Sequence, residues 1–437
     1  MERLLLEGAT VLTSRRQSVA DVLVVGDRVE DVLTPSGENQ EVRAGARAID
    51  LSGLVLGPGL VDLHVHLREP GQEWKEDIAS GSRAAAAGGY TAVVAMPNTD
   101  PPLDAGYQAR YIADRGRQVG LVEVIPAGCI TMGMEGKRLS HLDDLLAAGV
   151  RIFSDDGLTV TDSGLLRRAM EYVGSRDGVI CQHAEDPGLA AGGHLHEGRV
   201  SSLLGMTGIP TQAETTVVAR DLALAELTGA AYHVQHVSCG ETVALIRSAR
   251  ERGVKVTAEV APHHLVFTES EVLKMDSVAK MYPPLRTEAD VKALTQALLE
   301  GDIDAVATDH APHAAHEKDV PFEEAPKGVI GLETAFSAVC SVLGGPALRT
   351  VFERMSVAPA RIASLERHGN WIEPGIPANL VAVDPNQPWI PQRYRSKSTN
   401  SLFTGVPLVG QVRLTIHDGR ITYDASRVAD PDVEGSP

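Results

Sequence analysis

The middle of the chain repeats one local pattern, and this repetition limits the possible folds more than any other feature. From residue 57 onward, short runs of apolar residues alternate with Ala-rich segments of helical period, roughly eight times in succession. Runs such as YTAVVAM (residues 90–96) are apolar almost throughout, which is typical of strands buried on both faces. Such alternation predicts a parallel sheet, and eight repeats predict a closed α/β barrel of the (β/α)8 TIM type. An open doubly wound sheet is the alternative, but no GxGxxG sequence follows the first strand.

Both ends of the chain have a different texture. Residues 1–56 contain short strand-like pieces separated by Gly and Asp, and similar pieces return after about residue 365. We therefore predict a barrel domain over residues 57–364 and a small β-rich domain formed jointly by residues 1–56 and 365–437. The polar C-terminal tail, DASRVADPDVEGSP, is expected to fray.

Composition excludes several classes of protein. The chain has 40 basic and 58 acidic residues, and its net charge of −18 argues against a sequence-independent nucleic-acid binder. The sequence contains no apolar run long enough to span a membrane and does not begin like a signal peptide, so we expect a cytoplasmic protein. The cysteines are scattered without a CxxC pair, which favours reduced thiols over disulfides or a thiolate zinc site: Cys129, Cys181, Cys239 and Cys340.

Histidine and aspartate follow several of the predicted strands. In (β/α)8 barrels, catalytic residues lie at the C-terminal ends of the strands. His64 and His66 are two apart in one strand, so both side chains can point to the same ion. Nitrogen and oxygen donors from several strand ends predict a metal site. The candidates are His64, His66, Asp155 or Asp156, His183, His236 and Asp309.

An HxH pair alone is weak evidence, because one is expected by chance about half the time in a chain with this histidine content. A second pair, His194-Leu195-His196, lies in a Gly-rich loop with no strand before it, and we do not expect it to bind metal. Period-2 alternation does not decide between Asp155 and Asp156. The other histidines are expected to have structural roles: His233 packed on the opposite face of its strand, His310 supporting the site, His263 and His264 beyond a strand, and His141, His368 and His417 at the surface or in loops.

Two longer segments carry a resemblance. DLHVHLREPG (Asp62 to Gly71) and ATDHAPHAAHEK (Ala307 to Lys318) resemble the two signature motifs of the dihydroorotases, in the amidohydrolase superfamily. The resemblance extends over nearly the whole chain and includes AAAAGGYTAVVAMPNTDP, FSDDG, QHAED, HVSCGET, EVAPHH and GLETAF. Two long motifs in the right order make it highly specific.

The resemblance implies a metal centre with Zn²⁺, two ions per subunit. It selects Asp156 over Asp155, because Asp156 stands 27 residues before His183 as in the family. Asp309 corresponds to the catalytic aspartate, which also touches the first metal. The implied ligands are His64 and His66 for the first metal, Asp156 as the bridge, and His183 and His236 for the second.

The resemblance also implies a set of substrate contacts. Arg68, Asn98 and His313 correspond to residues that hold the substrate carboxylate. Lys327 and Gly328 lie where the family uses main-chain groups, so the side chain at 327 is expected to matter little. Tyr282 stands where the family usually has Asn before Pro-Pro-Leu-Arg.

The implied reaction is the reversible cyclisation of N-carbamoyl-L-aspartate to L-dihydroorotate in pyrimidine biosynthesis. It would use a metal-activated hydroxide, with Asp309 as general base and then acid. A hydantoinase or allantoinase is one rival, but the segment VRIFSDDG lacks the lysine that those enzymes carboxylate. A non-catalytic scaffold for aspartate transcarbamoylase is another, although here every ligand position is filled. The family further implies a homodimer and possible association with aspartate transcarbamoylase.

Overall fold

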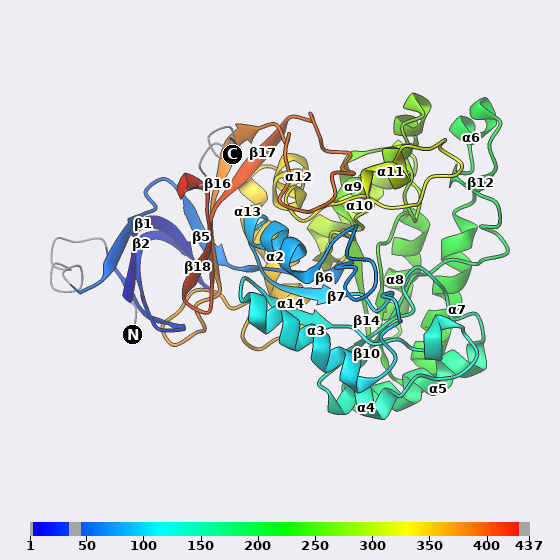
Figure 1. Ribbon diagram of the computed structural model, residues 1–437, viewed down its shortest axis with the longest axis horizontal. Coiled ribbons are helices and arrows are strands. Elements are labelled where there is room, and N and C mark those ends of the chain that lie inside the picture. The colour runs from blue at the N-terminus through cyan, green and yellow to red at the C-terminus, as the bar shows by residue number, and fades with distance from the viewer. Residues whose placement is uncertain (1–2, 35–44, 428–437) are drawn as a thin grey trace.

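The computed structural model describes residues 3–34 and 45–427 and consists of a barrel with a β-sheet beside it (Figure 1). Parallel pairing joins β6 to β7 and β8, and joins β9 through β10, β13 and β14 to β15. Parallel bridges between Gly128 and Phe153 and between Val65 and His310 close the ring. The predicted eight-stranded barrel is confirmed. Its strands are β6 (Leu60–Val65), β7 (Tyr90–Ala95), β8 (Glu123–Pro126), β9 (Ile152–Phe153), β10 (Val179–Gln182), β13 (Ala231–Val234), β14 (Val256–Val260) and β15 (Ala305–Val306).

Helices cover the outside of the barrel, and several begin at a side chain that caps the first turn. Asp77, Asp162 and Thr287 each accept a backbone N–H from the turn that follows. The main helices are α2 (Ile78–Ala87), α3 (Gly106–Val119), α4 (Leu142–Ala147), α5 (Ser163–Gly174), α7 (Gln212–Thr228), α8 (Gly240–Glu251), α10 (Glu288–Glu300) and α12 (Ala335–Leu343). Shorter elements are α6 (Arg199–Leu204), α9 (Pro262–Val266), α11 (Ala315–Lys318), α13 (Leu348–Phe352), α14 (Ala358–Ile362), β11 (Leu195–His196) and β12 (Gly208–Ile209).

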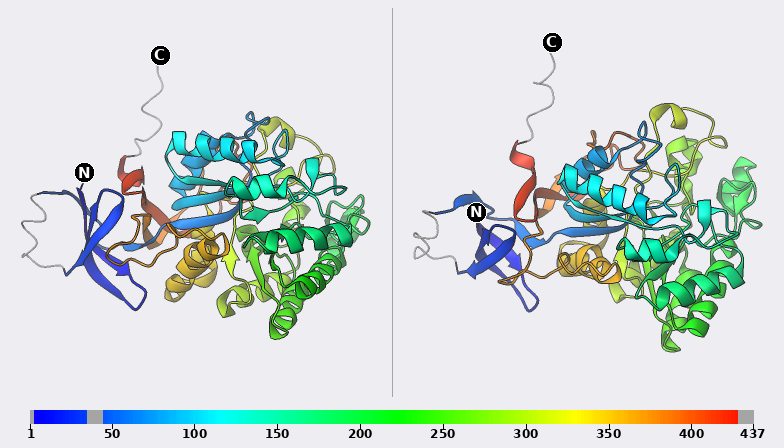
Figure 2. Two further views of the ribbon diagram at one scale, coloured as in Figure 1. Left: turned by 90° about the horizontal axis from the view of Figure 1, so that it is seen from below. Right: turned by 60° about the horizontal axis from the view of Figure 1, so that its bottom comes forward.

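The two ends of the chain form one sheet, as predicted. Figure 2 shows the blue N-terminal strands and the orange and red C-terminal strands together beside the barrel. The strand order is β18-β17-β16-β5-β1-β2-β3, with β4 paired to β1, and β16 runs antiparallel to β5. The strands are β1 (Arg3–Leu12), β2 (Gln17–Val25), β3 (Arg28–Leu33), β4 (Arg47–Asp50), β5 (Val55–Pro58), β16 (Leu380–Trp389), β17 (Leu408–His417) and β18 (Arg420–Asp424).

The sheet and the barrel share apolar packing. Leu4, Val22 and Leu380 belong to a core of the sheet itself. Val381 and Val412, from β16 and β17 of the same sheet, belong to the large apolar core of the barrel. The sheet is therefore packed against the barrel and not joined to it by a linker alone.

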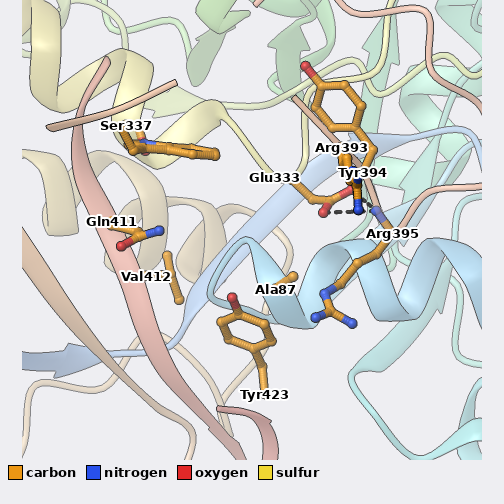
Figure 3. A pocket seen from close by; sticks show the side chains of 10 residues that line it. Ala87, Glu333, Ser337, Arg393, Tyr394, Arg395, Gln411, Val412 and Tyr423 are labelled. Carbon is orange, nitrogen blue, oxygen red and sulfur yellow. Dashed lines mark hydrogen bonds between the residues drawn. The ribbon is translucent and has the colours of Figure 1, made fainter. Parts of the chain in front are cut away.

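The segment between β16 and β17 crosses from the sheet to the barrel. In this crossing segment, the backbone N–H groups of Arg395 and Ser396 donate to the carboxylate of Glu333, which lies just before α12. A cavity of about 540 Å³ opens at this junction, lined by residues of α2, α12, β17 and β18 together with the crossing segment (Figure 3). Arg395 lies over the ring of Tyr423 in its wall, 5.4 Å from the ring centroid.

Several smaller expectations are settled by the structure. All four cysteines are free and buried. No helix in the described ranges is both long and apolar enough to cross a membrane. His368 lies in a loop, as the sequence allowed, but it is buried there with its ring between Thr91 and Glu123 and is not at the surface. Of the decoy pair, His196 lies on the short strand β11 (Leu195–His196) and not in a loop, whereas His194 precedes this strand in the loop. Of the tail expected to fray, residues 428–437 lie outside the described ranges.

Candidate active site and metal centre

A cavity of about 260 Å³ lies at the C-terminal ends of the barrel strands. Every predicted site residue except His64 lines it, and His64 is fully buried beside Asp156. The structure thus brings together residues that are spread over 265 positions of sequence. The lining residues are His66, Arg68, Asn98, Asp156, Gly157, His183, His236, Tyr282, Asp309, Ala311, His313, Lys327 and Gly328.

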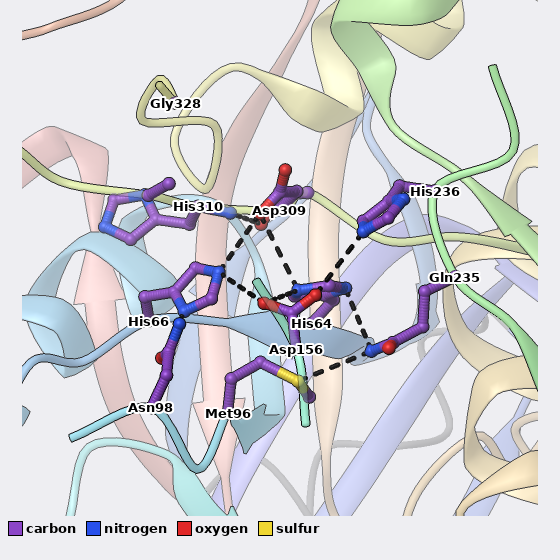
Figure 4. A network of polar contacts seen from close by, with 12 residues as sticks. His64, His66, Met96, Asn98, Asp156, Gln235, His236, Asp309, His310 and Gly328 are labelled. Carbon is purple, nitrogen blue, oxygen red and sulfur yellow. Dashed lines mark hydrogen bonds and ion pairs between the residues drawn. The ribbon is translucent and has the colours of Figure 1, made fainter. Parts of the chain in front are cut away.

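Asp156 lies between two pairs of histidines (Figure 4). Its Oδ2 is 3.3 Å from His64 Nε2 and 3.4 Å from His66 Nε2. Its Oδ1 is 3.4 Å from His236 Nε2 and 3.6 Å from His183 Nδ1. Each oxygen therefore faces one pair, which is the arrangement expected of a carboxylate that bridges two cations.

The first pair is oriented by hydrogen bonds on the far side of each ring. His64 Nδ1 donates to Glu259 Oε1 at 2.9 Å, and His66 Nδ1 donates to Asn98 Oδ1 at 2.8 Å. In the neutral tautomers both Nε2 atoms carry lone pairs toward Asp156. Without a cation between them, protons on these rings take its place and give the rings a positive charge. His64 Nε2 is buried and has no hydrogen-bond partner in the described part of the chain. Lone pairs that face a carboxylate call for a cation, so the donor set fits a metal ion.

The Asp156 carboxylate remains ionised. Burial by itself would raise the pKa of Asp156, but the charge of His64 and the hydrogen bonds from His183 and His236 outweigh burial. They hold this pKa well below its usual range. Asp155, in contrast, turns away and accepts the backbone N–H groups of Ile130 and Thr131. Of the two candidates, only Asp156 faces the histidines.

Asp309 is next to the first pair. Its Oδ1 is 3.2 Å from His66 Nε2 and 3.7 Å from His64 Nε2. Burial would raise its pKa, but the hydrogen bond with His66 and the histidine charges lower it. The neighbouring His310 is buried, and its Nδ1 accepts the backbone N–H of Gly331.

The backbone is strained at three residues of the site. Arg68, His236 and Asp309 have φ values of 61°, 32° and 46°. Non-glycine residues rarely occupy this region, and strain of this kind clusters at functional sites. Each of these three residues follows a barrel strand by two or three positions, and its side chain points into the cavity.

The opposite wall of the cavity carries groups suited to a carboxylate. The Arg68 side chain is buried, and its pKa, lowered by burial to about 10, leaves it cationic at neutral pH. Asn98 has its oxygen engaged by His66, so its NH2 group is left for a ligand. His313 donates from Nε2 to the carbonyl of Lys327 at 2.9 Å. Its Nδ1 has no hydrogen-bond partner among the described residues and lies 4.0 Å from Glu317 Oε2.

Comparison with known proteins identifies the family. Residues 53–242 match the family model described as "Dihydro-orotase-like". The dihydroorotase of Pelotomaculum thermopropionicum is 44% identical over 426 residues, covering 96% of this chain and 98% of that protein. The dihydroorotase of Mycobacterium leprae is 46% identical over 410 residues, covering 92% of this chain and 94% of that protein. The chain belongs to the dihydroorotase family.

Solved structures of other amidohydrolases share the dihydroorotase fold seen here. L-hydantoinase from Arthrobacter aurescens aligns with a TM-score of 0.84 at 24% identity, covering 97% of this chain and 96% of that one. Dihydropyrimidinase from Brevibacillus agri aligns with a TM-score of 0.81 at 22% identity, covering 97% of this chain and 95% of that one. At such identities the likeness is one of fold, namely the barrel with its β-rich domain.

One position departs from the usual dihydroorotase pattern. The ring of Tyr282 stacks on that of His183, with centroids 5.5 Å apart and planes at 24°. The ammonium of Lys327 lies 3.0 Å from the centroid of the same Tyr282 ring. Burial raises the pKa of Tyr282 and lowers that of Lys327 to about 8. The Lys327 side chain therefore reaches into the cavity, although only its main chain was expected to matter.

Sequence reasoning missed two contributors to this dihydroorotase site. Asn400 donates to the carbonyls of Ala311 and Gly328, but it lies in the range assigned to the β-rich domain. His233 was expected to face away from the site. It is buried as expected, but it contacts Glu259, which in turn holds His64.

The decoy histidines stay outside the metal centre. His196 Nδ1 lies 3.1 Å from a guanidinium nitrogen of Arg286. Neither His194 nor His196 belongs to a metal-capable cluster in the described residues.

Proposed function

We propose that the chain catalyses the reversible cyclisation of N-carbamoyl-L-aspartate to L-dihydroorotate in de novo pyrimidine biosynthesis. One observation carries the metal-dependent form of this proposal. Asp156 places one carboxylate oxygen toward His64 and His66 and the other toward His183 and His236. A pair of adjacent cation sites suits metal-dependent amide hydrolysis, in which bound cations activate water and polarise the amide oxygen.

The proposed cofactor is Zn²⁺, with two ions per subunit. His64, His66 and Asp309 would hold the first ion, His183 and His236 the second, and Asp156 both. Imidazole and carboxylate are suitable ligands for zinc. When bound, the ions supply Lewis-acid activation of water and of the amide oxygen.

Asp309 is the proposed proton carrier. In the hydrolytic direction, water attacks the ring carbonyl, a C–O bond forms and the ring C–N bond breaks. Asp309 takes the proton released by the water and returns it to the departing ring nitrogen. The lowered pKa of Asp309 keeps it ionised and ready to accept. In the cyclising direction, the same carboxylate takes the proton from the ureido nitrogen.

The substrate carboxylate is proposed to lie on the opposite wall. Arg68 offers a planar fork that matches two carboxylate oxygens, which lysine could not reproduce. The Asn98 amide and His313 Nδ1 face the same cavity. Burial, together with the charge of Arg68, lowers the pKa of His313 to about 2, so His313 binds as a neutral ring. Main-chain groups of Lys327 and Gly328 complete this wall.

The two rival functions are less well supported. Strand β9 and the residues after it, Ile152 to Gly157, contain no lysine that could be carboxylated, as hydantoinases require. A non-catalytic scaffold would not need the full set of ligands that this chain retains. We also propose a cytoplasmic homodimer that can associate with aspartate transcarbamoylase.

The test combines metal analysis with two substrates. Purified protein should contain zinc and hydrolyse L-dihydroorotate much faster than dihydrouracil, which lacks the carboxylate bound by Arg68. The same preference is expected for Tyr282→Asn, because loss of one neutral contact costs about tenfold or less. Equal or better use of dihydrouracil by the wild type would favour a hydantoinase-like activity instead.

A further inference from the structure

Lys327 extends from one side of the active-site cavity to the other. Its carbonyl accepts the Nε2–H of His313 on the side proposed for the substrate carboxylate. Its ammonium lies over the ring of Tyr282, which stacks on His183. The ammonium of Lys327 therefore lies on the side of the cavity where Tyr282 stacks on His183, one of the second pair of proposed metal ligands. The main chain of Lys327 contacts His313.

The charge of this cavity is unequally distributed. Arg68 and Lys327 are the Lys or Arg side chains among the described residues that line it. Arg68 Nε donates to the carbonyl of Pro312, three residues after Asp309, on the wall proposed for the substrate carboxylate. The Lys327 ammonium makes no hydrogen bond or close ion pair within the described chain. It lies over the Tyr282 ring and feels the charge of Glu185, which is hydrogen-bonded to Tyr282. An ammonium held by an aromatic face and a nearby charge, without a hydrogen bond, can turn toward an anionic ligand.

The proposed reaction changes the charge of the substrate. L-dihydroorotate carries one carboxylate. Hydrolysis breaks the ring C–N bond, forms a C–O bond and leaves a proton on nitrogen. The new carboxyl group then ionises at neutral pH, so N-carbamoyl-L-aspartate is a dianion. The second carboxylate forms at the former ring carbonyl, on the side of the metal ligands and away from Arg68.

Resting on the proposed function, we propose that Lys327 is a specificity-determining residue whose ammonium binds this second carboxylate. The role goes beyond the main-chain contact, because it distinguishes the open-chain dianion from the cyclic monoanion. Tyr282 holds the ammonium on the correct side of the cavity when no dianion is bound. The Tyr-Lys pair thereby supplies a charge where the usual Asn of the family supplies an amide.

Loss of the Lys327 charge is expected to change KM, but not the ratio of kcat/KM between the two directions of the reaction. The ratio of kcat/KM in the two directions is fixed by the equilibrium constant of the reaction, so no variant can alter it. The KM of each substrate is free to change. Loss of Lys327 should therefore weaken binding of N-carbamoyl-L-aspartate selectively.

The experiment compares zinc-loaded wild type, Lys327→Met and Lys327→Arg, with KM and kcat measured in both directions at pH 7. Lys327→Met should raise KM for N-carbamoyl-L-aspartate by roughly tenfold or more, as for loss of a charge-assisted hydrogen bond. KM for L-dihydroorotate should stay within about twofold. Lys327→Arg should recover most of the difference. Exposed Lys292→Met removes a charge far from the cavity and should leave both values unchanged.

Two results would overturn the proposal. A parallel rise in both KM values would mean that Lys327 only holds the loop carrying Gly328. Unchanged KM values in Lys327→Met would mean that the ammonium does not meet the dianion. Failure of the zinc-loaded wild type to act on L-dihydroorotate would instead overturn the proposed function, and this proposal with it.

Discussion

Asn400 accepts the backbone N–H of His313 through its side-chain oxygen, at 3.1 Å and across 87 residues of sequence. The amide of Asn400 also donates to Ala311 and Gly328, at 3.1 Å each. One buried side chain thus ties together two loops of the cavity wall. It comes from the segment that crosses between β16 and β17, so this part of the C-terminal region belongs to the active site.

We expect Asn400→Ala to damage the active site without removing a substrate contact. Three buried hydrogen bonds are lost, each with a net contribution of about 0.5–1.5 kcal/mol, and their partners are left buried. KM for dihydroorotate should rise and Tm should fall. The neighbouring exposed Thr399→Ala is the control for both measurements. Unchanged kinetics in Asn400→Ala would show that the loops hold their shape without it.

Metal content should depend on the histidines and carboxylate at the strand ends. His64→Ala and Asp156→Ala each remove a proposed ligand, so both should lose bound zinc and turnover. Asp156→Ala should have the larger effect on metal content, because its two oxygens serve both sites. His194→Ala should retain wild-type metal and activity. The assignment would be wrong if His194→Ala lost metal while His64→Ala kept it.

Glu259 should influence metal affinity without touching the metal. It holds His64 Nδ1 at 2.9 Å and His233 Nε2 at 3.0 Å. Burial would raise the pKa of Glu259, but the hydrogen bonds with these two rings lower it to about 2. Glu259→Gln should weaken zinc binding about 10–100-fold, as is common for residues that orient a ligand. Competition with a chelator measures this directly, and unchanged affinity would contradict it.

Asp309→Asn should separate proton transfer from metal binding. The variant keeps the size of the side chain and leaves the Asp156 bridge intact, so most of the metal should remain. Proton transfer by a positioned group contributes about 10²–10⁴-fold, so kcat should fall at least that far. Zinc analysis beside steady-state kinetics provides the two readouts. A variant with full metal and most of its activity would eliminate Asp309 as the proton carrier.

The fold could be predicted because the barrel strands are mostly apolar and each is followed by its own helix. Alternation within a strand, however, says nothing about residues beyond its end. Strand β9 ends at Phe153, so the alternation could not decide between Asp155 and Asp156. His236 has a φ of 32° and has left extended geometry. Counting three residues back from His236 as if the strand stayed extended therefore placed His233 on the wrong face. In the structure His233 shares Glu259 with His64.

Asn400 could not be found from local pattern at all. It lies outside the named strands, in a segment without helical or strand period, and its partners are backbone groups whose positions depend on the assembled barrel. The cluster of histidines was easier to predict, because side chains at strand ends converge in any closed barrel. Tyr282 was recognisable as a departure from the family, but its stacking on His183 required the tertiary structure.

Glu333 should make the stability of the protein depend on pH. Burial raises the pKa of Glu333 from 4.5 to about 7, although its carboxylate accepts the N–H groups of Arg395 and Ser396. The folded protein therefore holds this proton more tightly than the unfolded chain. The stabilising effect is complete below about pH 4.5 and is lost as the pH rises through about 7.

Glu333→Gln keeps an oxygen that can accept the same N–H groups but removes the titration. The free energy of unfolding of wild type, relative to Glu333→Gln, should fall between pH 5 and 7 by up to about 1.4 kcal/mol per pH unit. Denaturant unfolding of both proteins at several pH values measures this difference, and effects of pH on the metal centre cancel in the comparison. Exposed Glu366→Gln serves as the matched control. A difference that stays constant, or grows with pH, would show that Glu333 is already ionised in the folded protein.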